Sequence, residues 1–451
     1  MNAQFHDRRS AEFFVEPEST KLAQHSDEIT VGLLGCGNVG GGVVRILTEH
    51  ADQIAARVGV PVRLGQVAVR NTARTRDVMP ERLTNAPHQV TTDPQVDIVV
   101  EVMGGIEPAR SLIVEALEAG KSVVTANKEL ISTFGDELLA LAHGKGARLE
   151  YEAAVAGGIP IIKPLRESLA GDRVRKVLGI LNGTTNYILT QMTEQGMAFE
   201  EALADAQHLG YAERDPSADI EGYDAAAKAA ILASLAFDIQ IVAGDVYREG
   251  ITRVTTSDIA FARRMGYVIK LLAIAEDDGA HVGVRVHPCL IPSDHPLASV
   301  RDSFNAVFVE ADAVGDLMFY GRGAGSMPSA SAVVGDIVTA ARALLSGEQP
   351  AVLSARHRRP LRSFDELIAQ YSVRLSVADQ PGVLAQIASV FGSHSVSIKS
   401  VWQEGTGDTA ELVFITHAAR EGAVQATVRA LQALPVVRDI TSMLRVEGRE
   451  V

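Results

Sequence analysis

The sequence has few cysteines, no long apolar run and no excess of positive charge. Its 451 residues contain only two cysteines, Cys36 and Cys289. This scarcity excludes a disulfide framework and a zinc site made of thiolates, and it is typical of proteins from the reducing cytoplasm. No apolar run approaches the roughly 18 residues of a membrane-spanning helix. We therefore expect a cytoplasmic protein that does not associate with a membrane.

Charge and composition narrow the class further. The formal net charge of −14 at neutral pH argues against a nucleic-acid surface. Small molecules that carry phosphate groups remain compatible with it, through local basic residues. A hydrophobic content of 47% is enough to fill ordinary cores, and the length predicts about three domains. Residues 1–28 lack the apolar core of a signal peptide, so we interpret them as a flexible tail.

A glycine-rich turn follows the first apolar run. Residues 29–34 predict a strand, and apolar residues recur at helical spacing from residue 43 onward. The turn between them consists of Gly35, Cys36, Gly37, Asn38, Val39 and Gly40. Glycines permit a tight turn and close approach of a pyrophosphate, while the helix N-terminus supplies N–H groups to the phosphates. This context favours dinucleotide binding over a purely structural turn, with Cys36 as a small filler rather than a nucleophile.

The second predicted strand, at 64–69, ends in a basic loop. An acid at this point would bind a ribose 2′-hydroxyl, but the loop carries Arg70, Arg74 and Arg76 instead. Three arginines favour a 2′-phosphate, since the guanidinium group binds phosphate through paired hydrogen bonds. We therefore expect NADP(H) to be preferred, with NAD(H) possible; a solvated basic loop is the alternative.

Lys128 follows a further predicted strand at 122–125. Open parallel sheets bind ligands beyond the carboxyl ends of their strands, so Lys128 is expected to face the cofactor crevice. The alternative is a surface lysine that opens a helix. Lysine is unfavourable there because the helix dipole is positive at the N-terminus, which favours the functional interpretation.

The stretch 210–237 joins an acidic loop to an apolar helix. Twelve residues contain five carboxylates, Glu213, Asp215, Asp219, Glu221 and Asp224. Lys228 is the only charged residue between 225 and 237. A helix that is apolar on every face is usually buried, and a buried lysine must be paired or give up its proton. Asp224 lies one turn earlier on the same face, so we predict a buried pair rather than a surface salt bridge.

The acidic loop has three interpretations. A calcium loop starting at Asp215 needs glycine at its sixth position and glutamate at its twelfth, where this chain has Ile220 and Ala226. That motif is therefore excluded. A solvated loop remains, as does a carboxylate cage for a small cation such as a substrate ammonium group.

Three later segments combine glycines with small or polar residues. At 149–160, paired glycines suggest exposed backbone near a ligand or ion. Residues 174–189 predict a strand, a turn at Asn182 and Gly183, and a helix capped by Thr184 or Thr185. A second glycine-rich turn at 321–328 precedes a predicted helix from residue 329 to about 345.

The C-terminal part is predicted to be a separate unit. Residues 346–369 are polar and basic, as in a linker. From 370 onward we predict strands at 371–377, 396–402, 411–416 and 436–446, with one helix after residue 382 and another at 421–434. This βαββαβ order is ferredoxin-like. It contains no acid–base constellation, which suggests a role in binding or assembly.

Taken together, the motifs resemble homoserine dehydrogenases. The resemblance rests on VGLLGCGNVGGGV, EVMGGIEPA, TANKELI, YEAAVAGGIPII, GILNGTTNYIL, GYAERDPSADIEGYDAAAK and GAGSMPSASAVVGD, which occur in this order. DQPGVLAQIA at 379–388 resembles an ACT domain, a ligand-binding module of enzymes in amino-acid biosynthesis. The implied fold is an α/β Rossmann-type nucleotide-binding domain at 29–155, completed by a helix at 325–345. An α+β catalytic and dimerisation domain at 156–324 and a ferredoxin-like ACT regulatory domain at 370–451 would follow.

The resemblance also implies an activity and a site. The family reduces aspartate 4-semialdehyde to L-homoserine with NAD(P)H, on the path to threonine, methionine and isoleucine. In this family Lys128 lies between cofactor and substrate, and Asp224 and Lys228 form the essential pair, with Lys228 as the acid–base candidate. Glu213, Asp219 and Lys128 bind the substrate. The implied cofactor residues are Gly35, Gly37, Asn38, Val39, Gly40, Arg70, Thr125, Lys128 and Gly325. A monovalent cation, often sodium, is bound mostly by backbone oxygens at Glu152, Val155, Gly157 and Ile159.

Two other functions were weighed against this activity, and the resemblance also implies an effector and an oligomeric state. An aldehyde dehydrogenase that works through a cysteine thioester is disfavoured, because Cys36 lies in the wrong place and Cys289 has no evident base. From another class, the chain would be a regulatory protein that senses NADP and an amino acid without turnover. The resemblance implies L-threonine as effector and a homo-oligomer, either dimer or tetramer. A chain ending near Arg362 is expected to stay folded and active and to lose inhibition by threonine.

Overall fold

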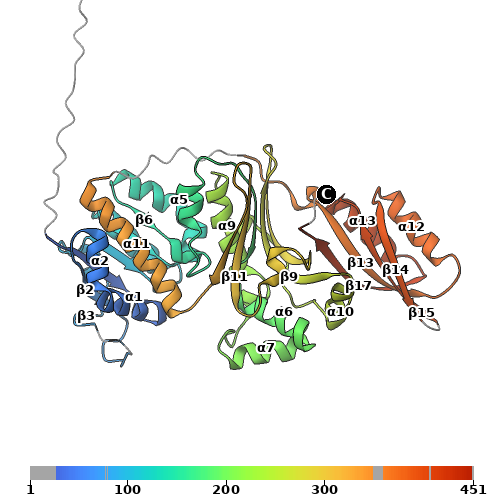
Figure 1. The fold of residues 1–451 in the computed structure, drawn as a ribbon, viewed down its shortest axis with the longest axis horizontal. Helices are drawn as coiled ribbons and strands as arrows, with labels where there is room; N and C mark the ends of the chain where they lie inside the picture. Colours follow the sequence, from blue (N-terminus) through green and yellow to red (C-terminus); the bar gives the residue numbers. More distant parts are fainter. Residues whose placement is uncertain (1–26, 77, 79, 349–358, 406–407, 449–451) are drawn as a thin grey trace, which may run out of the picture.

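The computed structural model describes residues 27–76, 78, 80–348, 359–405 and 408–448. Most of the predicted tail and the central part of the predicted linker lie outside these residues. Figure 1 shows three parts in a row, with the N-terminal α/β part at one end and the C-terminal α/β part at the other. A large sheet with α6, α7 and α9 lies between them.

The N-terminal part is a six-stranded parallel sheet of order β3-β2-β1-β4-β5-β6. Its strands are β1 Ile29–Leu34, β2 Val62–Ala68, β3 Leu83–Thr84, β4 Ile98–Glu101, β5 Ser122–Thr125 and β6 Leu149–Glu150. Its helices are α1 Asn38–Glu49, α2 Ala51–Val58, α3 His88–Thr92, α4 Ala109–Glu118 and α5 Lys128–Gly144. Central strand β4 is buried at every position, as expected where helices cover both faces of a parallel sheet. The predicted Rossmann-type fold is confirmed.

Helix α11, Ser326–Ser346, returns from far along the chain to pack on α1. A side chain at Gly42 would meet Ala330 Cβ at 2.8 Å, so the contact between the two helices requires glycine there. The helix begins at Ser326, next to the start at 325 implied by the resemblance and three residues before the start at 329 predicted from the pattern. It is the one helix in the described ranges with the length and composition of a membrane span, but half of it is buried in this packing, as in a core helix.

The central part is built on antiparallel strands in the order β12-β11-β7-β9-β10. These are β7 Val174–Ile180, β9 Tyr267–Asp277, β10 Val282–Pro292, β11 Phe304–Ala311 and β12 Gly315–Arg322, with short β8 Tyr247–Arg248 beside β10. The helices are α6 Gly183–Gln195, α7 Phe199–His208, α8 Ser217–Ile220, α9 Tyr223–Ala236 and α10 Thr256–Arg264.

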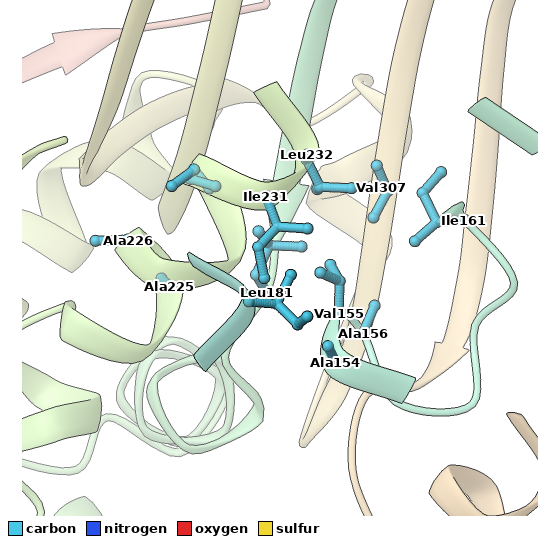
Figure 2. Close-up of a cluster of buried hydrophobic side chains, with 14 of the residues drawn as sticks. Ala154, Val155, Ala156, Ile161, Leu181, Ala225, Ala226, Ile231, Leu232 and Val307 are labelled. Atoms are coloured by element: carbon cyan, nitrogen blue, oxygen red, sulfur yellow. The ribbon is translucent and has the colours of Figure 1, made fainter. Parts of the chain in front are cut away.

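Helix α9 is the buried centre of this part. Every residue from Asp224 to Ser234 is buried, which confirms the expectation drawn from its apolar faces. Figure 2 shows its side chains Ile231 and Leu232 among Leu181, Val155 and Val307, which come from three other segments. This packing fixes the first two turns of α9, which carry Asp224 and Lys228.

The C-terminal part has the predicted βαββαβ order. It comprises β13 Ile368–Ala378, α12 Val383–Ser393, β14 Ile398–Gly405, β15 Thr409–Thr416, α13 Glu421–Gln432 and β17 Val437–Val446, with a two-residue strand β16, Ala419–Arg420, beside β13. The antiparallel order β17-β13-β15-β14 is that of a ferredoxin-like sheet. Its core is a cluster of its own around Tyr371, Ile387 and Phe414.

The C-terminal part is nevertheless joined to the central sheet. Strand β17 pairs in parallel with β10, with Arg445 opposite Cys289 and Val446 opposite Leu290, so that one sheet of eleven strands runs through both parts. Arg359, within the predicted linker, binds the Asp277 carboxylate at 2.7 Å. The predicted unit thus has its own core but shares a sheet with the central part. Hydrophobic patterning within the unit carried no signal for this pairing at its edge.

Candidate active site

The candidate site is centred on the Asp224 carboxylate in the first turn of α9. Its Oδ2 lies 2.7 Å from Lys228 Nζ, and its Oδ1 lies 2.9 Å from Lys128 Nζ at the start of α5. Burial alone would raise the pKa of Asp224, but the two ammonium groups outweigh it and hold this pKa well below its usual range. One carboxylate thus binds two lysines that come from different domains.

The two lysines differ in surroundings. The Lys228 side chain is 11% exposed and also donates to the carbonyl oxygen of Leu181 at 2.7 Å. The Lys128 side chain is 36% exposed. The Asp224 charge raises the pKa of Lys128 against the opposing effect of burial, so Lys128 stays charged. Lys228 is therefore the better enclosed of the two ammonium groups.

Asn182 links the second carboxylate of the site to the first. Its Nδ2 donates to Asp219 Oδ1 at 2.6 Å and to Asp224 Oδ2 at 2.9 Å. The Thr184 hydroxyl lies 3.0 Å from Asp219 Oδ2. Burial and the nearby Asp224 charge raise the pKa of Asp219. Asn182 also accepts from Thr185 N and thereby caps α6, so the predicted cap at Thr184 or Thr185 is wrong.

A cleft of about 430 Å³ lies over the glycine turn. It is lined by Cys36, Gly37, Asn38, Gly41, Gly42, Arg45, Arg74, Thr75, Arg76, Val78, Ser326 and Met327. Any side chain at Gly40 would meet Gly35 O at 2.3 Å, so the turn requires glycine there. The Ser326 hydroxyl donates to Asn38 O at 2.5 Å and ties the start of α11 to the turn. A dinucleotide pyrophosphate fits such a turn at the N-terminus of α1.

Comparison with known proteins identifies the family. Family models described as homoserine dehydrogenase and as its NAD-binding domain match residues 160–338 and 35–152, and an ACT-domain model matches 371–436. The homoserine dehydrogenase of Mycobacterium leprae is 50% identical over 436 residues, which cover 94% of this chain and 99% of that protein. The chain belongs to the homoserine dehydrogenase family.

Further relatives agree over nearly the whole length. The homoserine dehydrogenase of Corynebacterium glutamicum is 47% identical and covers 93% of this chain and 96% of its own. The crystal structure of the enzyme from Thiobacillus denitrificans superposes with a TM-score of 0.89 at 42% identity, covering 93% and 98% of the two chains. The protein is thus a homoserine dehydrogenase, an oxidoreductase acting on a CH–OH group. These relatives give no support to a regulatory protein without turnover.

The structure brings together four of the residues predicted for this homoserine dehydrogenase site: Lys128, Asp219, Asp224 and Lys228. It places Glu213 on the exposed loop after α7, outside the Asp224 cluster. Thr125 is fully buried, and its hydroxyl donates to Glu101. Asn182 and Thr184 were missed as site residues. The sequence Asn-Gly-Thr-Thr at 182–185 was the available signal, because it places polar side chains directly after a predicted strand.

Of the three arginines expected near a 2′-phosphate, two line the cleft of this homoserine dehydrogenase and one does not. Arg74 and Arg76 line the cleft, together with Arg45 from α1. The Arg76 guanidinium donates to Arg74 O and Asn71 O, both at 2.7 Å, and so shapes the loop. Arg70 is exposed and is not among the residues that line the cleft. Its contact with a 2′-phosphate stays a prediction.

The predicted cation-binding segment has an unusual backbone. Ala156 and Gly157 have φ angles of 54° and 53°, in the left-handed region that disfavours side chains. The Glu152 carboxylate is used within the protein, because it accepts from Ile161 N, Ile162 N and Lys163 N at 2.6, 2.7 and 2.9 Å. Among the described residues, no cluster of three His, Cys, Asp or Glu side chains could hold a metal. A cation here would therefore depend on backbone oxygens, as the family resemblance implies.

Cys289 does have a neighbouring base, contrary to expectation. Its Sγ lies 3.1 Å from His287 Nδ1, because residues two apart in strand β10 point to the same face. Both side chains are fully buried. Burial raises the pKa of the Cys289 thiol and lowers the pKa of His287, which keeps both neutral. The thiol is closed off from substrate, so thioester chemistry remains disfavoured.

Proposed function

We propose that this enzyme reversibly reduces L-aspartate 4-semialdehyde to L-homoserine, with NADPH preferred over NADH, on the path to threonine, methionine and isoleucine. The observation that carries the proposal is the Asp224 carboxylate held by Lys128 and Lys228 at 2.9 and 2.7 Å. A buried acid that fixes two cations from two domains suits a small substrate with both positive and negative groups.

Each group of the substrate has a counterpart in the site. Asp219 and, from the exposed loop, Glu213 are suited to the substrate ammonium. The Lys128 ammonium is suited to its carboxylate. A bound nicotinamide would supply or accept the hydride. Lys228 would then give its proton to the oxygen on which negative charge develops, and Asp224 would stabilise the charged lysine in the reverse direction.

The proposed effector is L-threonine, and the proposed assembly is a dimer or tetramer in the cytoplasm. The ACT domain supports a small-molecule regulator. Both ends of the eleven-stranded sheet are open edges, formed by β12 and β14. Exposed Tyr320 and Val401 lie on these edge strands, and unpaired edges of this kind are suited to pairing with a second copy. Threonine bound between two ACT domains would act by biasing the arrangement of subunits.

We also propose a sodium ion, or a similar monovalent cation, at the backbone oxygens of Glu152, Val155, Gly157 and Ile159. The left-handed pair Ala156–Gly157 supports this, because it turns the chain sharply between these positions. A Cβ on Gly157 would meet Gly323 O at 2.4 Å. The segment is thus held against the glycine-rich turn before α11, close to the cofactor cleft.

One assay tests the function and its accessory ligands. NADPH oxidation is followed with L-aspartate 4-semialdehyde as substrate, in sodium and in tetramethylammonium buffers, each with and without L-threonine. We expect turnover that falls when sodium is replaced and when threonine is added. No turnover with either NADPH or NADH would refute the proposed reaction. Turnover without a threonine effect would leave the ACT domain to assembly or to another ligand.

The cofactor preference is tested at the basic loop. Arg70→Asp is expected to lower the NADP-to-NAD ratio of kcat/KM by about tenfold or more, the size of a lost charge-assisted contact to a phosphate. Arg74→Asp is measured beside it, since Arg74 lines the cleft. Arg63→Asp is the matched control, because this exposed arginine on β2 pairs with Glu28 instead. A ratio that moves only for Arg74→Asp would transfer the role from Arg70 to Arg74.

A further inference from the structure

Glu101 is a fully buried carboxylate at the carboxyl end of β4, in the middle of the parallel sheet. A buried charge is costly unless hydrogen bonds replace its water. Glu101 Oε1 accepts from Met103 N at 2.7 Å and from Gly104 N at 3.0 Å. Its Oε2 accepts from the Thr125 hydroxyl at 2.7 Å. One side chain therefore ties the loop after β4 to the end of the neighbouring strand β5.

The connection continues to the start of α5. Thr125 Oγ1 accepts from Asn127 N at 3.0 Å. Asn127 caps α5 by accepting from Leu130 N at 3.1 Å, and its Nδ2 donates back to Gly105 O at 2.6 Å. The two loops are thus closed on each other at two points, and the first residue of the helix that they hold is Lys128.

Both loops need such support. Gly104 and Gly105 have φ angles of 74° and 73°, which glycine adopts readily, but two such flexible residues do not by themselves hold the loop in one conformation. Lys128 stands at a helix N-terminus, where the dipole opposes a positive charge. It reaches across the domain boundary to Asp224 Oδ1 at 2.9 Å. The position of this ammonium group therefore depends on what fixes the first turn of α5.

We infer that Glu101 is a positioning residue, which clamps the loops after β4 and β5 and thereby places Lys128 against Asp224. The inference rests on the proposed role of Lys128 in substrate binding. Glu101 itself is buried beneath the loops and does not reach the cleft. Its effect on the reaction passes through Thr125, Asn127 and the start of α5.

The test is a double-mutant cycle between Glu101→Gln and Lys128→Ala. Glutamine keeps the shape of the side chain but presents an amide donor in place of one carboxylate oxygen. Alone, it is expected to lower kcat/KM for aspartate 4-semialdehyde by about tenfold to hundredfold, as for a reacting group displaced by about 1 Å. In the Lys128→Ala background it should cost almost nothing more, because the residue it positions is gone. NADPH affinity, measured by calorimetry, should stay near the wild-type value.

Thr125→Val and Thr125→Ser complete the test. Valine removes only the hydroxyl that Glu101 binds, so Thr125→Val should lower kcat/KM as much as Glu101→Gln does. Serine keeps the hydroxyl, so the kcat/KM of Thr125→Ser should stay near that of the wild type. Thr125→Val also replaces Glu101→Gln in the cycle if the glutamine variant folds poorly. Effects that multiply in the Lys128→Ala background, or NADPH affinity that falls in parallel with kcat/KM, would overturn the inference. Normal kinetics of Lys128→Ala alone would instead refute the proposed role of Lys128.

Discussion

Replacing Lys228 by alanine is expected to lower kcat by about two to four orders of magnitude, the usual cost of losing a general acid–base. Cofactor affinity should stay nearly intact. Lys228 Nζ binds Asp224 and the Leu181 carbonyl at 2.7 Å each, whereas the cleft over the glycine turn is lined by other residues. The measurement is steady-state kinetics in both directions, with NADPH binding followed separately by calorimetry.

The pH dependence has a definite direction. Homoserine oxidation should be favoured at alkaline pH, because the accepting lysine must first be neutral. The pKa of Lys128 is raised by Asp224, so Lys128 stays charged as pH rises and is poorly suited to accept the proton. Near-normal turnover of Lys228→Ala would make Lys228 a structural partner of Asp224, and Lys128 the better candidate.

Lys121→Ala is the matched control for removing an enclosed lysine. Lys121 is 7% exposed and donates to the carbonyl oxygens of Asp93 and Val96 at 2.5 and 2.6 Å. Lys121 immediately precedes the amino end of β5, whereas Lys128 follows the carboxyl end of the same strand. The two lysines therefore lie at opposite ends of the parallel strands. Its loss should lower thermal stability and leave kcat unchanged.

The parts of the site that the sequence predicted are those encoded by local spacing. Asp224 and Lys228 are one helical turn apart, and Lys128 follows directly after a parallel strand, so simple geometry brings each to the crevice. The bridging role of Asn182 was not predictable in this way. Its partners Asp219 and Asp224 lie 37 and 42 residues further along the chain. Only the tertiary contacts of α6 with α8 and of β7 with α9 bring them within hydrogen-bond distance.

Two further contacts were missed, for different reasons. The His287 and Cys289 pair was open to prediction, because alternate residues of a strand share a face. The pairing of β17 with β10 was not, because a ferredoxin-like unit satisfies its own hydrophobic pattern without revealing which neighbour completes its edge. The polar residues that line this junction, Lys176, Arg285 and Glu447, lie far apart in sequence and show no common motif.

Replacing Glu447 by alanine is expected to destabilise the protein by about 3–5 kcal/mol, the cost of leaving buried charges without their partner. Glu447 directly follows β17 and is 6% exposed. Its Oε2 lies 2.9 Å from Lys176 Nζ and its Oε1 2.8 Å from an Arg285 guanidinium nitrogen. Arg285 is itself 2% exposed. The variant leaves Lys176 without this carboxylate and leaves Arg285 with Glu276, at 2.9 Å, as its remaining partner.

The pH dependence of this contribution has a definite sign. Burial alone would raise the pKa of Glu447, but Lys176 and Arg285 outweigh it and hold this pKa well below the ordinary value of 4.5. The stabilisation is therefore full above about pH 4.5 and is lost as pH falls toward the folded-state pKa. In Glu447→Ala this part of the acid sensitivity should disappear.

Calorimetry tests whether the ACT domain is held firmly against the central sheet or is attached only through the chain. We expect the melting temperature of Glu447→Ala to fall by at least about 5 °C, with the ACT domain unfolding before the rest. Glu404→Ala is the matched control. Its partner Arg264 at 2.7 Å also belongs to the central part, but both side chains are more than half exposed, so the loss should stay below about 1 kcal/mol. Equal, small shifts for both variants would mean that the ACT domain is attached only loosely. Because a chain ending at Arg362 loses Glu447 and uncovers the edge of β10, we now expect that truncation to lower stability as well as regulation.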